Sequence, residues 1–109
     1  MKSFTQKIFI NDLDVIDVQI GQEVDFENLI ENLAFLGYVN KDRVESRGAF
    51  AIRGGQIDIY PLNSEYPTRI IFNGDEVIEL KLFDFITQRS LKNIKKVLIT
   101  PSSELFQTK

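Results

Sequence analysis

The chain has 109 residues, 43% of them hydrophobic and 27% charged, which suits one globular domain with a single core. It contains no cysteine and no histidine, which excludes disulfides, thiolate zinc sites and serine–histidine triads. The net charge of −3 and a pI of about 4.9 argue against a general nucleic-acid binder, and no apolar run reaches the roughly 18–20 residues of a membrane span. We therefore expect a cytoplasmic protein that is not an enzyme and that holds no metal and no cofactor.

The first twenty residues predict a lead-in followed by a strand. Residues 1–14 are mixed in character, and the apolar residues 8–10 suggest that part of this lead-in docks on the core. Over 15–20, Ile16, Val18 and Ile20 alternate with polar residues, which is the pattern of a half-buried strand.

One amphipathic helix is expected over 26–36. Asp25 stands where an N-cap would accept backbone N–H groups, and Gly37 stands where a C′ residue adopts a positive φ. Between them, apolar residues recur every three or four positions and form one stripe. The stripe consists of Phe26, Leu29, Ile30, Leu33 and Leu36.

After Gly37 the hydrophobic period changes to two, which predicts strands. Gly54-Gly55 and Asn73-Gly74-Asp75 are typical of hairpin turns, and the last residues, 105–109, are expected to fray. The fold class that follows is α+β, with one main helix packed on a mostly antiparallel β-sheet with two β-hairpins. The predicted strands are 49–53, 56–60, 68–72, 76–84 and 96–100.

Alternation along the predicted strands sorts their side chains onto two faces. The face expected to receive the helix is apolar and consists of Phe50, Ile52, Ile57, Ile59, Ile70, Phe72, Ile78, Leu80 and Leu82. The opposite face mixes charged, aromatic and apolar residues and consists of Ala49, Ala51, Arg53, Asp58, Tyr60, Arg69, Ile71, Val77, Glu79, Lys81 and Phe83.

Two interpretations of this mixed face stay open from the spacing alone. In the first, loops or the N-terminal segment cover its large apolar residues Ile71, Val77 and Phe83. In the second it is a protein-docking surface, because arginine and tyrosine are enriched where partners bind. For Arg53, the purely structural alternative is a cross-strand pair with Asp58.

Several segments, taken in order, carry a resemblance to a known family. The longest is RGAFAIRGGQIDIYP at 47–61, and the others are IGQEVD at 20–25, LGY at 36–38, PTRI at 67–70, FNGDEV at 72–77, FD at 83–84 and TQRS at 87–90. Together they resemble the UvrA-binding domain shared by the bacterial repair proteins UvrB and Mfd, the transcription-repair coupling factor, and TQRS favours Mfd. The resemblance covers about 15–104, so we divide the chain into a lead-in (1–14), this domain (15–104) and a tail (105–109).

The resemblance implies a non-catalytic interaction module of nucleotide excision repair. In the family this domain binds UvrA, the damage-recognition ATPase, while RNA polymerase and DNA are contacted only through other domains of the parent protein. The helicase motifs belong to those other domains, and no phosphate-binding loop of the GxxxxGK[ST] type is present in this chain.

Most of the family's UvrA contacts are arginines around the first hairpin. By this resemblance Arg53 and Arg47 each match one of them, whereas Ala51 stands where UvrB has a further arginine. A fourth arginine of the family corresponds to Asn40, beside which Lys41 supplies charge without a planar fork. The partner-binding residues that we predict are Lys41, Arg47, Arg53, Asp58, Tyr60, Arg69 and Ile71.

Two alternatives of other classes remain beside UvrA docking. The module could dock within its own parent protein in a structural or autoinhibitory role. It could also bind nucleic acid weakly through Lys41, Arg43, Arg47 and Arg53, with a steep salt dependence that protein docking lacks.

Overall fold

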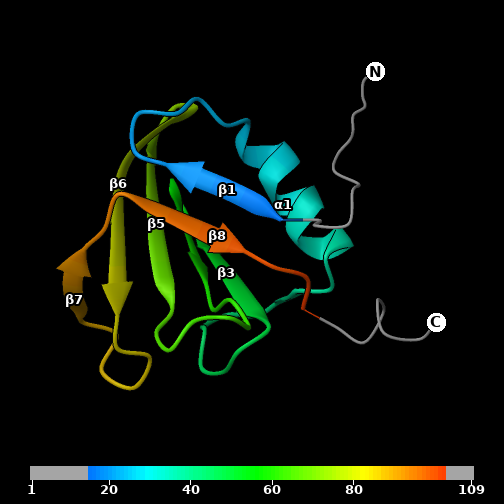
Figure 1. Ribbon diagram of the computed structural model, residues 1–109, viewed down its shortest axis with the longest axis vertical. Coiled ribbons are helices and arrows are strands. Elements are labelled where there is room, and N and C mark those ends of the chain that lie inside the picture. Colours follow the sequence, from blue (N-terminus) through cyan, green and yellow to red (C-terminus); the bar gives the residue numbers. More distant parts are fainter. Residues whose placement is uncertain (1–14, 103–109) are drawn as a thin grey trace.

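The computed structural model describes residues 15–102 as one helix and two β-sheets (Figure 1), which confirms the predicted α+β class. A six-stranded sheet has the order β2-β3-β4-β5-β6-β7, and β1 and β8 form a separate pair. The predictions for 1–14 and 105–109 lie outside the described residues. The elements are β1 (Ile16–Gln19), α1 (Phe26–Phe35), β2 (Val39–Asn40), β3 (Ala49–Arg53), β4 (Gln56–Ile59), β5 (Thr68–Asn73), β6 (Glu76–Phe83), β7 (Ser90–Asn93) and β8 (Lys96–Ile99).

Helix α1 begins and ends where its capping residues predict. The Asp25 side chain accepts a hydrogen bond of 3.0 Å from the backbone N–H of Asn28, which satisfies one donor of the first turn. At the other end Gly37 has φ 97°, a conformation that glycine adopts without strain. Leu29 and Leu33 are buried, so the apolar stripe is the packing face of the helix.

Both predicted hairpins are present in the six-stranded sheet. Arg53 lies opposite Gln56 in the first hairpin, and Asn73 lies opposite Glu76 in the second. All neighbouring strands are antiparallel except β2 and β3, which run parallel. The sequence pattern did not predict β2 and β7, because they are short and exposed along their whole length and therefore show no alternation.

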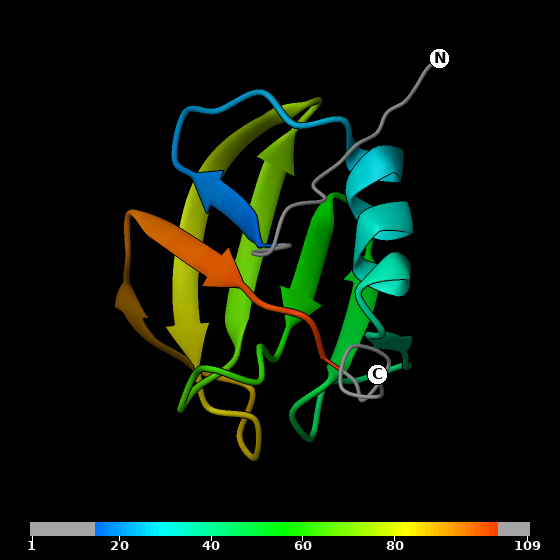
Figure 2. The same cartoon turned by 45° about the vertical axis from the view of Figure 1, so that its right-hand side comes forward.

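The core lies between the sheet and a second layer made of α1 and the β1–β8 pair, which both cover the same face of the sheet (Figure 2). Strand β1 runs antiparallel to β8, so Ile16 lies opposite Ile99 although 83 positions separate them along the chain. Fourteen buried residues form this cluster: Val18, Leu29, Leu33, Leu36, Tyr38, Phe50, Ile57, Ile59, Ile70, Phe72, Val77, Leu80, Val97 and Ile99.

Tyr38 ties three segments together at the end of the helix. Its hydroxyl donates to the carbonyl of Thr100 at 2.7 Å and accepts from the N–H of Leu62 at 3.2 Å. Burial raises the pKa of this hydroxyl, which keeps it protonated and able to donate.

One assignment of residues to sheet faces was wrong. We predicted Ile78 on the helix side and Val77 on the opposite face, but Val77 is buried in the core cluster and Ile78 is 41% exposed. A β-bulge explains the exchange: Ile71 pairs with Glu79 and Phe72 with Val77, so Ile78 has no partner in the register. Because of this extra residue, Val77 and Ile78 point to the faces opposite to those that strict alternation along β6 predicts.

Candidate protein-docking surface

The sheet face that points away from α1, here called the outer face, is partly covered by two loops. Ala49, Ala51, Tyr60 and Phe83 are buried there in a small cluster with Val44 from the 41–48 loop. Phe85 of the 84–89 loop packs against the same cluster, and its ring centroid lies 5.8 Å from that of Tyr60. The covering interpretation is therefore right for Phe83, whereas Ile71 stays half-exposed.

In the middle of this face Asp58 and Arg69 form a bidentate ion pair. The Nε and Nη2 atoms of Arg69 donate to Oδ1 and Oδ2 of Asp58 at 2.9 and 3.0 Å, and the two side chains are 13% and 1% exposed. The guanidinium also lies over the ring of Phe83, 4.1 Å from its centroid. A cross-strand pair between Asp58 and Arg53 was the wrong expectation, because the strand register places Asp58 opposite Arg69.

The 84–89 loop completes the cage around Arg69. The carbonyl of Gln88 accepts from Nη1 of Arg69 at 3.2 Å, and the Gln88 side chain donates to the carbonyls of Phe85 and Val44 at 2.7 and 3.3 Å. Gln88 has φ 67°, a left-handed conformation that non-glycine residues adopt at a cost. Sequence analysis did not identify Gln88, since nothing in its local pattern indicates either the conformation or these remote acceptors.

Two other basic side chains of the 41–48 loop are engaged by backbone acceptors. Arg47 donates through Nε to the carbonyl of Ser64 at 2.9 Å, and its guanidinium lies 5.2 Å from the centroid of the Tyr60 ring. Arg43 donates through Nη2 to the carbonyl of Ile86 at 3.1 Å. Both contacts lie at the end of the sheet opposite the first hairpin.

Arg53 closes β3 at the hairpin end of the outer face and is exposed. Among residues 15–102 its side chain has neither a hydrogen-bond acceptor nor an ion-pair partner. The turn beside it is tight: Gly54 has φ 57°, and a Cβ at Gly55 would lie 3.3 Å from the carbonyl oxygen of Phe72. The hairpin therefore fixes the backbone from which Arg53 projects, while its guanidinium stays unengaged.

The structure brings some of the predicted site residues together and separates others. Asp58, Tyr60 and Arg69 are contiguous, but they are buried or internally bonded and form the floor of the outer face. Lys41 follows the edge strand β2 and is exposed, as is Asn40. Ala51, at the place of a further family arginine, is buried in the cluster with Val44.

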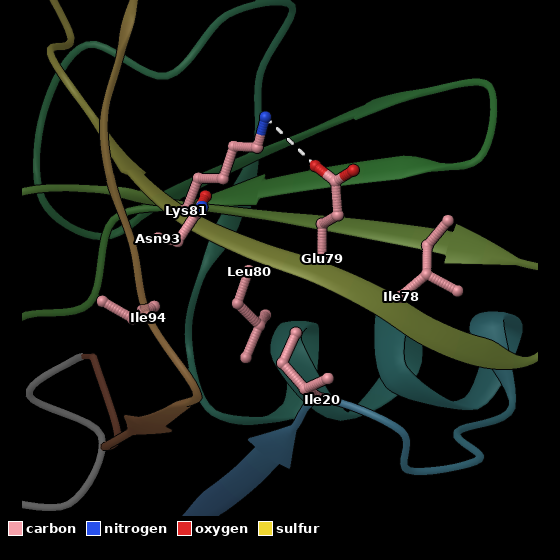
Figure 3. A pocket seen from close by; sticks show the side chains of 7 residues that line it. All are labelled: Ile20, Ile78, Glu79, Leu80, Lys81, Asn93 and Ile94. Atoms are coloured by element: carbon pink, nitrogen blue, oxygen red, sulfur yellow. Dashed lines mark ion pairs between the residues drawn. The ribbon is translucent and has the colours of Figure 1, made fainter.

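A shallow hollow of about 350 Å³ lies elsewhere, between β6 and the end of β1 (Figure 3). Its apolar lining includes Ile20 and Leu80, and the bulge residue Ile78 stands at its margin. The two charged groups, Glu79 and Lys81, form an ion pair at 3.0 Å and point away from the apolar floor. Because Glu79 and Lys81 are paired with each other and point away from the hollow, neither is placed to act there as a general acid or base.

Comparison with known proteins assigns the family. The family model described as the UvrB interaction domain matches residues 16–105. The chain belongs to the UvrB interaction domain family. The resemblance that its motifs carry is thereby confirmed.

Curated relatives of two kinds match this member of the family. The transcription-repair-coupling factor of Bacillus subtilis (strain 168) is 40% identical over 89 residues, which are 82% of this chain and 8% of that protein. The one from Staphylococcus haemolyticus is 39% identical over 93 residues, or 85% of this chain and 8% of that protein. The UvrABC system protein B of Thermosipho africanus is 34% identical over 98 residues, which are 90% of this chain and 15% of that protein. The chain thus spans less than a sixth of the length of these relatives.

The family and the outer face together describe a protein-interaction domain of the kind found in repair factors. No group of three or more acidic residues within 15–102 is arranged to hold a metal ion. In the same part of the chain no helix is long and apolar enough to cross a membrane.

Proposed function

We propose that this chain is a non-catalytic docking module of a bacterial nucleotide excision repair factor, and that it binds UvrA through the outer face around the first hairpin. The observation that carries the proposal is the contrast among the outer-face arginines. Arg43, Arg47 and Arg69 each donate to an acceptor within the fold, whereas the side chains of Arg53 and Arg89 have no such acceptor among residues 15–102. Of these two, Arg53 is the one at the first hairpin, and Arg89 lies at the other end of the sheet.

An unengaged guanidinium on a tight hairpin is suited to bind a carboxylate of a partner. Its five N–H donors form a fork that matches a carboxylate, and the neighbouring Gly54–Gly55 turn limits backbone motion. Ile71 lies half-exposed opposite Gln56 and so offers apolar surface close to Arg53. Arginine with apolar neighbours is a combination that is frequent at the energetic centre of interfaces.

Support for UvrA as the partner comes from the family and its arginine pattern. Arg53 and Arg47 stand where the family's UvrA-binding arginines are expected. Lys41 follows Asn40, so this chain offers a point charge where a fourth arginine is common. RNA polymerase and DNA, in this proposal, are partners of other domains of the parent protein.

The test is calorimetric titration of this domain with its cognate UvrA. The wild type is expected to bind, and Arg53→Ala is expected to weaken binding by about 1–3 kcal/mol, or roughly 5- to 150-fold. Lys92→Ala removes an exposed positive charge from β7 and serves as the matched control, which should leave the affinity unchanged. A folded wild type that does not bind UvrA would contradict the proposal.

A titration with duplex DNA separates this function from nucleic-acid binding. Binding to phosphates falls steeply between about 50 and 200 mM salt, and each lost phosphate contact lowers the slope by about one. Salt-sensitive DNA binding that Arg53→Ala and Arg47→Ala both reduce would favour the nucleic-acid alternative over UvrA docking.

A further inference from the structure

Ile86 is the most exposed of the large hydrophobic residues that the structure describes, with 69% of its surface accessible. Single exposed apolar residues are common in folded proteins and require no explanation by themselves. What distinguishes Ile86 is the loop that presents it. The 84–89 loop projects from the end of β6, at the end of the sheet away from the two hairpins (Figures 1 and 2).

The backbone on both sides of Ile86 is held by hydrogen bonds. The Asp84 carboxylate accepts from the N–H of Ile86 at 2.7 Å and from that of Thr87 at 3.1 Å. The N–H of Gln88 donates to the carbonyl of Asp84, and the Gln88 side chain donates to that of Phe85. A loop ordered before binding loses little conformational entropy when a partner covers it.

Two arginines flank this tip. Arg43 reaches across from the 41–48 loop to the carbonyl of Ile86, with its own side chain 46% exposed. Arg89 lies at the exposed neck of the loop, where its carbonyl accepts from the N–H of Asp84. Two carboxylates also lie here: Asp84 is engaged by the N–H groups of Ile86 and Thr87, and Glu45, at 3.6 Å from Arg43, is 68% exposed, so its pairing is weak in water.

The tip and Arg53 belong to one continuous area. They lie at opposite ends of the outer face: β3 is roughly 15 Å long at about 3.3 Å per residue, and β6, which leads to the tip, is three strand spacings of about 4.8 Å away, so the two are roughly 20 Å or more apart. A standard interface covers about 800 Å² of each partner, which corresponds to a patch roughly 30 Å across. One partner centred on this face reaches both.

We infer that Ile86 is the apolar anchor of the docking surface, and that it enters an apolar socket whose rim carries carboxylates facing Arg43 and Arg89. The inference rests on the proposed function, because it assigns a second contact to the same partner. It adds a largely exposed apolar side chain to an outer face on which Tyr60 and Phe83 are covered and Ile71 is only partly exposed. Apolar anchors that fill a pocket carry a large share of interface energy.

The experiment uses the same UvrA titration with three variants of the domain. Ile86→Ala is expected to weaken binding at least tenfold, whereas Ile86→Leu, which keeps the side-chain volume, should stay within about threefold of wild type. Leu91→Ala is the matched control: Leu91 is 48% exposed on β7, and its truncation should not change the affinity. Because Ile86 is exposed, the melting temperature of all three should equal that of wild type.

The acidic rim is tested by the salt dependence of association. The double variant Arg43→Gln and Arg89→Gln should slow association with UvrA and flatten its dependence on ionic strength. Tight binding of Ile86→Ala, together with loss of affinity in Arg53→Ala, would overturn the anchor and leave the proposed function standing. A wild type that does not bind would overturn both.

Discussion

At the two ends of the outer face, arginine side chains are in opposite situations. At the loop end, Arg43 and Arg47 donate to backbone carbonyls of other loops, and Arg69 in the middle is enclosed by Asp58, Phe83 and Gln88. At the hairpin end, Arg53 has no acceptor among the described residues. Three of the five arginines therefore stabilise the fold, whereas Arg53 at the hairpin end and Arg89 at the exposed neck of the 84–89 loop have no side-chain acceptor among residues 15–102.

The difference follows from what each backbone segment leaves unsatisfied. The 41–48, 61–67 and 84–89 loops have carbonyl groups that no sheet neighbour uses, and guanidinium groups satisfy several of them. At the first hairpin the strands pair directly, with Arg53 opposite Gln56, and the carbonyl of Gly55 accepts from the N–H of Phe72 rather than from Arg53. Mutations at the two ends should accordingly separate stability from binding.

The largest effect is expected from Asp58→Ala. It leaves the Arg69 guanidinium, 13% exposed, without its counter-ion, and unfolding free energy should fall by about 3–5 kcal/mol. Urea unfolding followed by circular dichroism measures this loss. Replacing both Asp58 and Arg69 by leucine is the control and should recover much of it, because no charge then stays buried. A loss below about 1 kcal/mol in the single variant would show that Arg69 does not need this partner.

A smaller effect is expected at Gln88, and its size depends on the replacement. Gln88→Ala removes the bonds to Phe85 and Val44 but keeps a side chain at φ 67°, so stability should fall by about 1–3 kcal/mol. Gln88→Gly removes the same bonds and relieves the left-handed strain, so it should be about 1 kcal/mol more stable than the alanine variant. Equal melting curves for the two would contradict the left-handed conformation.

The smallest effects come from the exposed arginines, and these sharpen the comparison. Arg47→Gln loses the bond to Ser64 and the contact with the Tyr60 ring, which together stabilise by about 1 kcal/mol. Arg53→Gln removes no contact within the described fold and should change stability by less than about 0.5 kcal/mol. The two variants have the same change of charge, so each is the other's control in urea unfolding. A greater loss for Arg53→Gln would refute its unengaged state.

Local signals were sufficient for much of the fold. The helix needed only its apolar stripe, the Asp25 cap and Gly37, and the hairpins needed only their turn residues between alternating strands. Alternation was not sufficient at the start of β6, where a bulge between Val77 and Glu79 exchanged Val77 and Ile78 between the faces. A bulge shows itself in the pairing with the neighbouring strand, and that pairing is not visible along one strand.

The candidate surface was only partly predictable for the same reason. Periodicity placed Arg53, Asp58 and Arg69 on the outer face, but it offered Asp58 to the wrong arginine. The 61–67 loop sets the register of β4 against β5, and this register brings Asp58 opposite Arg69. The 84–89 loop with its Ile86 tip is held mainly by bonds within itself, but the bond from Gln88 to Val44, which fixes the loop over the outer face, joins segments that are distant in the sequence.

The sequence by itself determined the fold class, the helix, both hairpins and the family, because caps, turn residues, periodicity and ordered motifs act over a few neighbouring residues. Only the tertiary structure decided which outer-face side chains are covered and which arginines have an acceptor within the fold. Of the covering groups, Val44 comes from the loop that precedes β3, whereas Phe85 and Gln88 come from a loop that is remote along the chain from β3 and β4. Exposure at a sheet face is a property of what packs over it, which alternation within a strand does not contain.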